Sequence, residues 1–168
     1  MNGAQVHLLL NHLPVLGALF TFLLLLWGVV RRNETIQKTA FAAMVIVGLS
    51  AIPVYLSGEP AEEVIEDMPG VEEAYIEEHE TMGKFALWAG IALGVAAIAG
   101  IGVVAVRPAS ITSAAVVLLV LNALVFGVMA YTAHTGGQIR HPEIRQQQAP
   151  PAEAGTPQGE QDKEAETD

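Results

Sequence analysis

Long runs of apolar residues divide the chain into four segments. They cover approximately residues 6–30, 39–56, 85–106 and 111–134, and none contains an acidic or basic residue other than histidine. Each run is close to the length of about 20 residues that a helix needs to cross the apolar core of a bilayer. The pattern predicts an all-α fold, a transmembrane four-helix bundle. Because the first run lacks a preceding basic stretch and exceeds the length of a typical signal-peptide core, we expect it to be retained as a span.

The connections between the runs differ sharply in charge. Residues 57–83, between the second and third runs, hold ten acidic residues and no Lys or Arg: Glu59, Glu62, Glu63, Glu66, Asp67, Glu72, Glu73, Glu77, Glu78 and Glu80. A Pro69-Gly70 break predicts two short helical pieces in this acidic extramembrane loop, the second running into the third span. Residues 146–168 are rich in Gln, Pro, Ala and Glu, so we expect a disordered acidic tail after a membrane domain of residues 1–145.

Basic residues favour one orientation in the membrane. The two short connections carry Arg31, Arg32, Lys38 and Arg107, which is typical of cytoplasmic loops. Basic residues also flank the opposite ends of the spans, so the bias is small. We expect both termini and the acidic loop to face outward.

The composition limits the available chemistry. The chain contains no cysteine, which excludes disulfides, thiolate metal sites, iron–sulfur clusters and covalent haem attachment. Imidazole and carboxylate remain as the strong ligands. No nucleophile and base pair, phosphate-binding glycine loop or nucleic-acid patch is evident, so an accessory or electron-carrying role is favoured over an independent enzyme.

All five histidines, His7, His12, His79, His134 and His141, fall at the outer end of the predicted bundle. A histidine inside a span is costly unless it faces a partner, a cavity or a cofactor. His12 lies deepest in the first run, about 8 Å below its start. His7 lies about 140° around the same ideal helix, so we do not expect these two side chains to bind one ion.

Converging imidazoles in an apolar bundle are typical of a b-type haem with two histidine ligands. The sequence favours His12, His79 and His134 as the residues from which the two ligands are drawn. His7 and His141 are supporting or alternative ligands, and Tyr131 lies on nearly the same face as His134. The resulting function is electron transfer, alone or within a larger membrane redox complex.

Two other functions remain open. The same histidines, His12, His79 and His134, could bind copper or another divalent metal, with nearby carboxylates as oxygen ligands. The candidate carboxylates are Glu59, Glu77, Glu78 and Glu80. Alternatively, the protein binds no cofactor and is an accessory subunit of a respiratory or photosynthetic complex. In either case the lipid bilayer is one partner, and the acidic loop is either a solvated surface or a docking surface for a basic soluble electron carrier.

Small and polar residues inside the spans have a packing role. Gly90 and Gly94 form a small-xxx-small pattern that lets helices approach closely. Asn11 and Asn122 are predicted to form hydrogen bonds between helices.

The first span opens with Val6-His7-Leu8-Leu9-Leu10-Asn11-His12-Leu13-Pro14. This stretch resembles the H-x4-H-[LF]-P opening of a group of small bacterial four-span membrane proteins of unknown function. The later Gly136-Gly137-Gln138-Ile139-Arg140-His141 is similar to a Gly-Gly element with a nearby histidine in that group. The resemblance covers approximately residues 6–145 and implies a four-span protein of the bacterial inner membrane with a shared set of histidines. In its histidine arrangement the chain also resembles a small membrane cytochrome of the b type.

Overall fold

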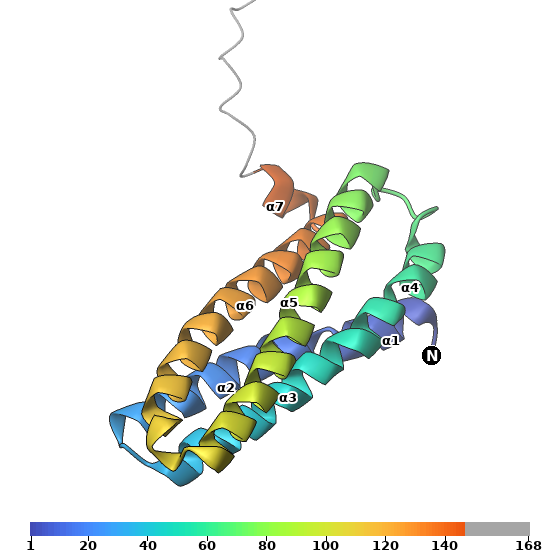
Figure 1. Ribbon diagram of the computed structural model, residues 1–168. Coiled ribbons are helices and arrows are strands. Elements are labelled where there is room, and N and C mark those ends of the chain that lie inside the picture. The colour runs from blue at the N-terminus through green and yellow to red at the C-terminus, as the bar shows by residue number, and fades with distance from the viewer. Residues whose placement is uncertain (147–168) are drawn as a thin grey trace, which may run out of the picture.

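The computed structural model describes residues 1–146, and all the regular structure in this range is helical. The tail expected over residues 146–168 lies outside the described residues, except for the backbone of Gln146. The helices are α1 (Gly3–Leu10), α2 (His12–Val30), α3 (Glu34–Leu56), α4 (Gly58–Ile65), α5 (Glu73–Val106), the 3-10 turn η1 (Pro108–Ser110), α6 (Ile111–Arg140) and α7 (Pro142–Gln146) (Figure 1).

Four helical stretches are long and apolar enough to cross a membrane, which confirms the prediction of an all-α four-span fold. They are Gly3–Val30, Glu34–Ile65, Glu73–Val106 and Pro108–Arg140. Each stretch is longer than its apolar run, because the helices continue past the apolar segment at one or both ends. α5 alone has 34 residues, or about 50 Å at 1.5 Å per residue, against a bilayer core of about 30 Å.

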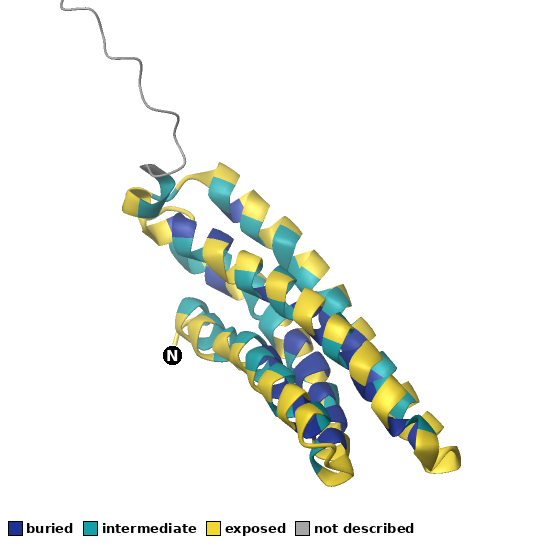
Figure 2. Ribbon diagram, turned by 90° about the vertical axis from the view of Figure 1, so that its left-hand side faces the viewer, coloured by how far each residue is buried: buried dark blue, intermediate teal, exposed yellow. Residues whose placement is uncertain are grey.

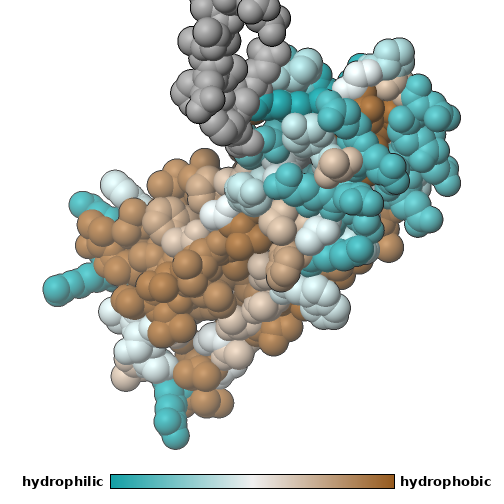
Figure 3. Space-filling view, turned by 90° about the horizontal axis from the view of Figure 1, so that it is seen from above, coloured by the Kyte–Doolittle hydropathy of each residue, from teal (hydrophilic) through white to brown (hydrophobic). Residues whose placement is uncertain are grey.

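The four long helices form a closed ring in which α2 contacts α3, α3 contacts α5, α5 contacts α6, and α6 contacts α2. Phe41, Leu25, Met44 and Leu93 are fully buried along its axis. The opposite faces of the helices carry exposed apolar side chains. Figure 2 shows buried and exposed positions alternating along each helix. In the face seen in Figure 3, apolar side chains cover the middle of the bundle, a large hydrophilic area lies at one end, and a few hydrophilic groups project at the other. The exposed apolar belt is the surface that faces lipid.

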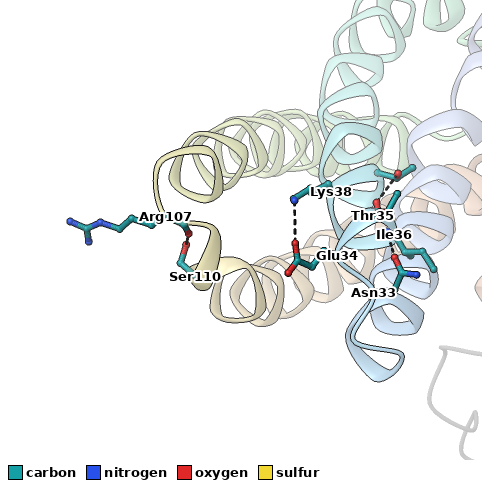
Figure 4. A network of polar contacts seen from close by, with 8 residues as sticks. Asn33, Glu34, Thr35, Ile36, Lys38, Arg107 and Ser110 are labelled. Carbon is teal, nitrogen blue, oxygen red and sulfur yellow. Dashed lines mark hydrogen bonds and ion pairs between the residues drawn. The ribbon is translucent and has the colours of Figure 1, made fainter.

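The two ends of the bundle differ. At one end, short turns join α2 to α3 and α5 to α6, and most of the polar contacts are local (Figure 4). There the Asn33 side chain caps α3 through the N–H of Ile36, and Lys38 pairs with Glu34 at 3.3 Å. The other end carries α1, α4 and α7 together with the first turns of α5, and we call it the histidine end because His7 and His79 lie there.

The acidic connection is mostly helical. α4 covers its first part, the chain turns at Gly70 with φ of +82°, and α5 begins at Glu73 and runs into the third span. This agrees with the two helical pieces expected on either side of the Pro69-Gly70 break. α1 packs mainly against α4, so these short helices form one side of the histidine end, and α5 and α6 form the other.

Buried polar groups tie the spans together. The Asn122 amide of α6 donates to Thr21 Oγ1 of α2 at 2.9 Å and to Ala18 O at 3.3 Å, which confirms its predicted interhelical role. Asn11 lies at the break between α1 and α2, and its Oδ1 is buried with no hydrogen-bond partner among the described residues.

Glycines let α3 and α5 approach closely. A Cβ added at Gly48 would lie 2.6 Å from the carbonyl oxygen of Gly90 and 3.0 Å from Gly94 Cα, both of which are backbone atoms. The close approach predicted from Gly90 and Gly94 is thus present, and Gly48 is its counterpart on the facing helix.

The contact at Gly48 can be tested with an alanine pair. Gly48→Ala should destabilise the bundle by about 1–3 kcal/mol, because backbone must move to admit the methyl group. Gly102→Ala is the matched control, since a Cβ there meets nothing within 4 Å. Unfolding of each variant in detergent by a denaturant titration measures both effects, and equal stability of the two variants would contradict the packing described here.

Candidate functional site

Two imidazoles meet at the histidine end. His7 of α1 and His79 of α5 have ring centroids 6.1 Å apart and perpendicular ring planes. Both side chains are half-buried, and they reach the contact from opposite sides of the bundle. The site therefore bridges the α1–α4 side and the α5–α6 side.

Hydrogen bonds fix the His79 ring. Its Nδ1 lies 3.0 Å from the carbonyl oxygen of Thr132 and 3.2 Å from Thr135 Oγ1. The Thr135 hydroxyl donates to the same carbonyl at 2.9 Å. A carbonyl oxygen can only accept, so Nδ1 carries the proton and Nε2 keeps its lone pair.

His7 is held in the same way. Its Nδ1 lies 2.9 Å from Ser57 Oγ at the end of α3. The Ser57 hydroxyl donates its single proton to Val54 O at 2.7 Å, so its oxygen accepts from His7 Nδ1–H. Both imidazoles thus have Nδ1 protonated and anchored and Nε2 available, the arrangement that orients histidines as metal ligands.

Gly136 makes room for His79. A Cβ added at Gly136 would lie 2.8 Å from His79 Cε1, 3.2 Å from Nδ1 and 3.3 Å from Nε2. Only glycine lets the α6 backbone lie this close to the ring. At the next residue, Gly137, the nearest contact of such a Cβ is Ile144 Cδ1 at 3.9 Å, which is ordinary packing distance.

The remaining candidate residues lie on the surface. His12 is exposed, and its Nδ1 lies 2.8 Å from the carbonyl oxygen of Leu8 one turn earlier. His134 is exposed beside Tyr131, with ring centroids 6.4 Å apart, and the Tyr131 hydroxyl donates to Glu78 at 3.1 Å. The structure therefore brings His79 together with His7, and not with His12 or His134.

His141 lies in the link between α6 and α7. It is exposed, and its Nδ1 lies 2.8 Å from Glu143 Oε1. The pKa of the Glu143 carboxyl is held below its usual value, first by a hydrogen bond from its own backbone N–H and then by one from His141. This is a local surface pair, separate from His7 and His79.

Within residues 1–146, no group of three or more His, Asp or Glu side chains is placed to hold a metal ion. Of the carboxylates considered as oxygen ligands, Glu78 binds Tyr131, and Glu80 pairs with Lys84 at 2.9 Å. The described donor set at the site is thus two imidazoles.

Three residues of the site could not be identified from the sequence. Ser57, Thr132 and Thr135 are ordinary helix and helix-end residues, and they meet the histidines only through contacts across the bundle. Gly136 could be singled out from the sequence, because it belongs to the Gly-Gly element near His134.

Comparisons with protein-family models, curated proteins and solved structures find no match for this chain.

The different burial of the histidines predicts their order of reaction with diethyl pyrocarbonate, which modifies unprotonated imidazole nitrogens. Exposed His12 and His141 should react several-fold faster than half-buried His7 and His79. Mass spectrometry of peptides after brief modification in detergent measures each rate. Equal rates at His12 and His79 would contradict the described placement.

Proposed function

We propose that this chain is a membrane electron-transfer protein in which His7 and His79 bind the iron of a b-type haem. The observation that carries the proposal is the pair of neighbouring imidazoles, each anchored through Nδ1 and each keeping its Nε2 lone pair. Two imidazoles from facing sides of a helical bundle are a common way of holding such a haem.

The separation of the rings would let His7 and His79 hold one metal atom between them. With a metal–nitrogen bond of about 2.0 Å, two imidazoles on one metal have ring centroids about 5–6 Å apart. The centroids of His7 and His79 are 6.1 Å apart.

The number of ligands at the site supports haem over a divalent metal. A zinc or copper ion in a protein takes three or four side-chain ligands, whereas a haem iron needs two from the protein. The contact between His7 and His79 offers two imidazoles, and residues 1–146 hold no group of three or more ligand side chains.

A bound haem would supply one-electron chemistry, and the residues that hold its ligands would influence its reduction potential. Ser57 Oγ and the Thr132 carbonyl accept hydrogen bonds from the Nδ1–H groups of His7 and His79, which would make each imidazole a stronger electron donor to a bound iron. The apolar spans beneath the site exclude water from the side that faces the membrane.

The charge distribution suggests the setting of the protein. Arg31, Arg32 and Arg107 lie exposed at the end opposite to the histidines, and we propose that this end faces the cytoplasm of a bacterial cell. The histidine end and its acidic surface then face outward. An acidic surface there suits exchange of electrons with a basic soluble carrier or a larger membrane redox complex.

The ligand assignment is tested with four alanine variants. His7→Ala and His79→Ala should each lower haem content at least about tenfold relative to wild type, since each removes an iron ligand. His12→Ala and His134→Ala should retain haem, because both side chains lie exposed. Pyridine haemochrome quantification on detergent-purified protein, expressed with haem precursors, measures the content.

Two outcomes would overturn the assignment. Loss of haem in His12→Ala with retention in His7→Ala would show that His12, and not His7, is the ligand from the first span. If the wild type is colourless and contains stoichiometric copper or zinc that His7→Ala loses, the site binds a divalent metal and not haem.

The room around His79 gives a second test. Gly136→Ala should reduce haem content and shift the absorption bands of any haem that remains, because the new methyl group displaces the His79 ring. Gly137→Ala adds the same methyl group to the same helix, where it has room, and should behave like wild type. A normal spectrum in both variants would exclude His79 as a ligand held in this position.

A further inference from the structure

Arg145 of α7 joins the ends of two helices that do not follow one another in the chain. Its side chain is only 9% exposed, an unusual burial for an arginine at the edge of a membrane protein. Its contacts lie on the last turn of α6, on the segment that leads into α5 and on the first turn of α5.

On the α6 side, Arg145 caps the helix. Its Nε donates to Gln138 O at 2.5 Å, and its Nη2 donates to Ile139 O at 2.6 Å. The carbonyls of the last turn of a helix have no partner within the helix, and a cation is favoured at that end. The flat guanidinium group satisfies two of them at once.

On the α5 side, Arg145 holds the first turn. Its Nη1 pairs with Glu72 Oε1 at 2.7 Å, and its guanidinium carbon lies 4.1 Å from the centre of the Tyr75 ring. Tyr75 and His79 are four residues apart, so they lie on the same face of α5. The arginine therefore fixes α5 one turn from His79.

Thr135, a hydrogen-bond partner of His79, and Gly136, which lies against its ring, are close to the arginine contacts. Thr135 is four residues before Ile139 on α6, and Gly136 lies between Thr135 and the two capped carbonyls. Arg145 thus ties the α6 turn that carries the partners of His79 to the α5 turn just before His79.

We propose that Arg145 is a positioning residue for the His7–His79 site, holding the His79 ring against Thr132, Thr135 and Gly136. Its effect on the ring follows from the geometry alone, and its effect on haem rests on the function proposed above. The capping bonds and the Tyr75 contact carry most of this role, because Glu72 is 65% exposed and an exposed ion pair contributes little.

The chain offers matched control variants. Arg145→Ala removes all the contacts, Arg145→Lys keeps the charge but loses the planar group, and Glu72→Gln removes only the ion pair. Arg140→Ala removes the same charge at the same end of the molecule, where the exposed Arg140 has a 3.4 Å contact with Met68 Sδ.

The test is nitrogen NMR of the full-length chain in detergent micelles with labelled histidine, without added haem. Wild type should show His79 as a single Nδ1–H tautomer. Arg145→Ala should shift and broaden the His79 signals and leave those of His7 near their wild-type positions. Arg145→Lys should be intermediate, and Glu72→Gln and Arg140→Ala should match wild type.

Unchanged His79 signals in Arg145→Ala would overturn the proposal. Equal changes at His7 and His79 would also overturn it, because they would show a general loss of structure. With haem supplied, Arg145→Ala should bind it about tenfold more weakly than Arg140→Ala does. A wild type without haem would defeat the proposed function while the NMR result still decides the role of Arg145.

Discussion

An imidazole buried between helices is stable only if its N–H finds an acceptor, because little water is present to provide one. In this protein the acceptors are the Thr132 carbonyl for His79 and the Ser57 hydroxyl for His7. Thr132 lies on α6, which packs beside α5, and Ser57 lies between α3 and α4, of which α4 packs beside α1. The relative placement of these helices therefore determines whether the two rings meet with both Nδ1 atoms anchored.

Close packing elsewhere in the bundle makes this placement specific. Gly48 lets α3 and α5 touch backbone to backbone, and Gly136 lets α6 lie against the His79 ring. The buried Asn122 links α6 to α2 near the middle of the membrane. These contacts fix three helices relative to α5, and they explain how a bundle with a simple apolar core can still present a defined polar site at one end.

Hydropathy was sufficient to predict the fold. Four uncharged runs correspond to the four spanning helices, and the Pro69-Gly70 break correctly separated α4 from α5. Helical geometry also predicted that His7 and His12 point in different directions. Which histidines face the interior of the bundle was not predictable, because the depth of a residue in the membrane does not determine the direction of its side chain. His12 lies deeper in the run than His7, yet its ring turns back to Leu8 on the exposed surface. The roles of Ser57, Thr132 and Arg145 depend on contacts between distant parts of the chain, which no local pattern contains.

Electron paramagnetic resonance of the oxidised, detergent-purified protein tests the central claim most directly. Two imidazole ligands on one ferric haem would produce a low-spin iron. We therefore expect a low-spin ferric signal at about one iron per chain. A high-spin ferric signal, or no haem iron in protein supplied with haem precursors, would contradict the assignment of His7 and His79 as a ligand pair.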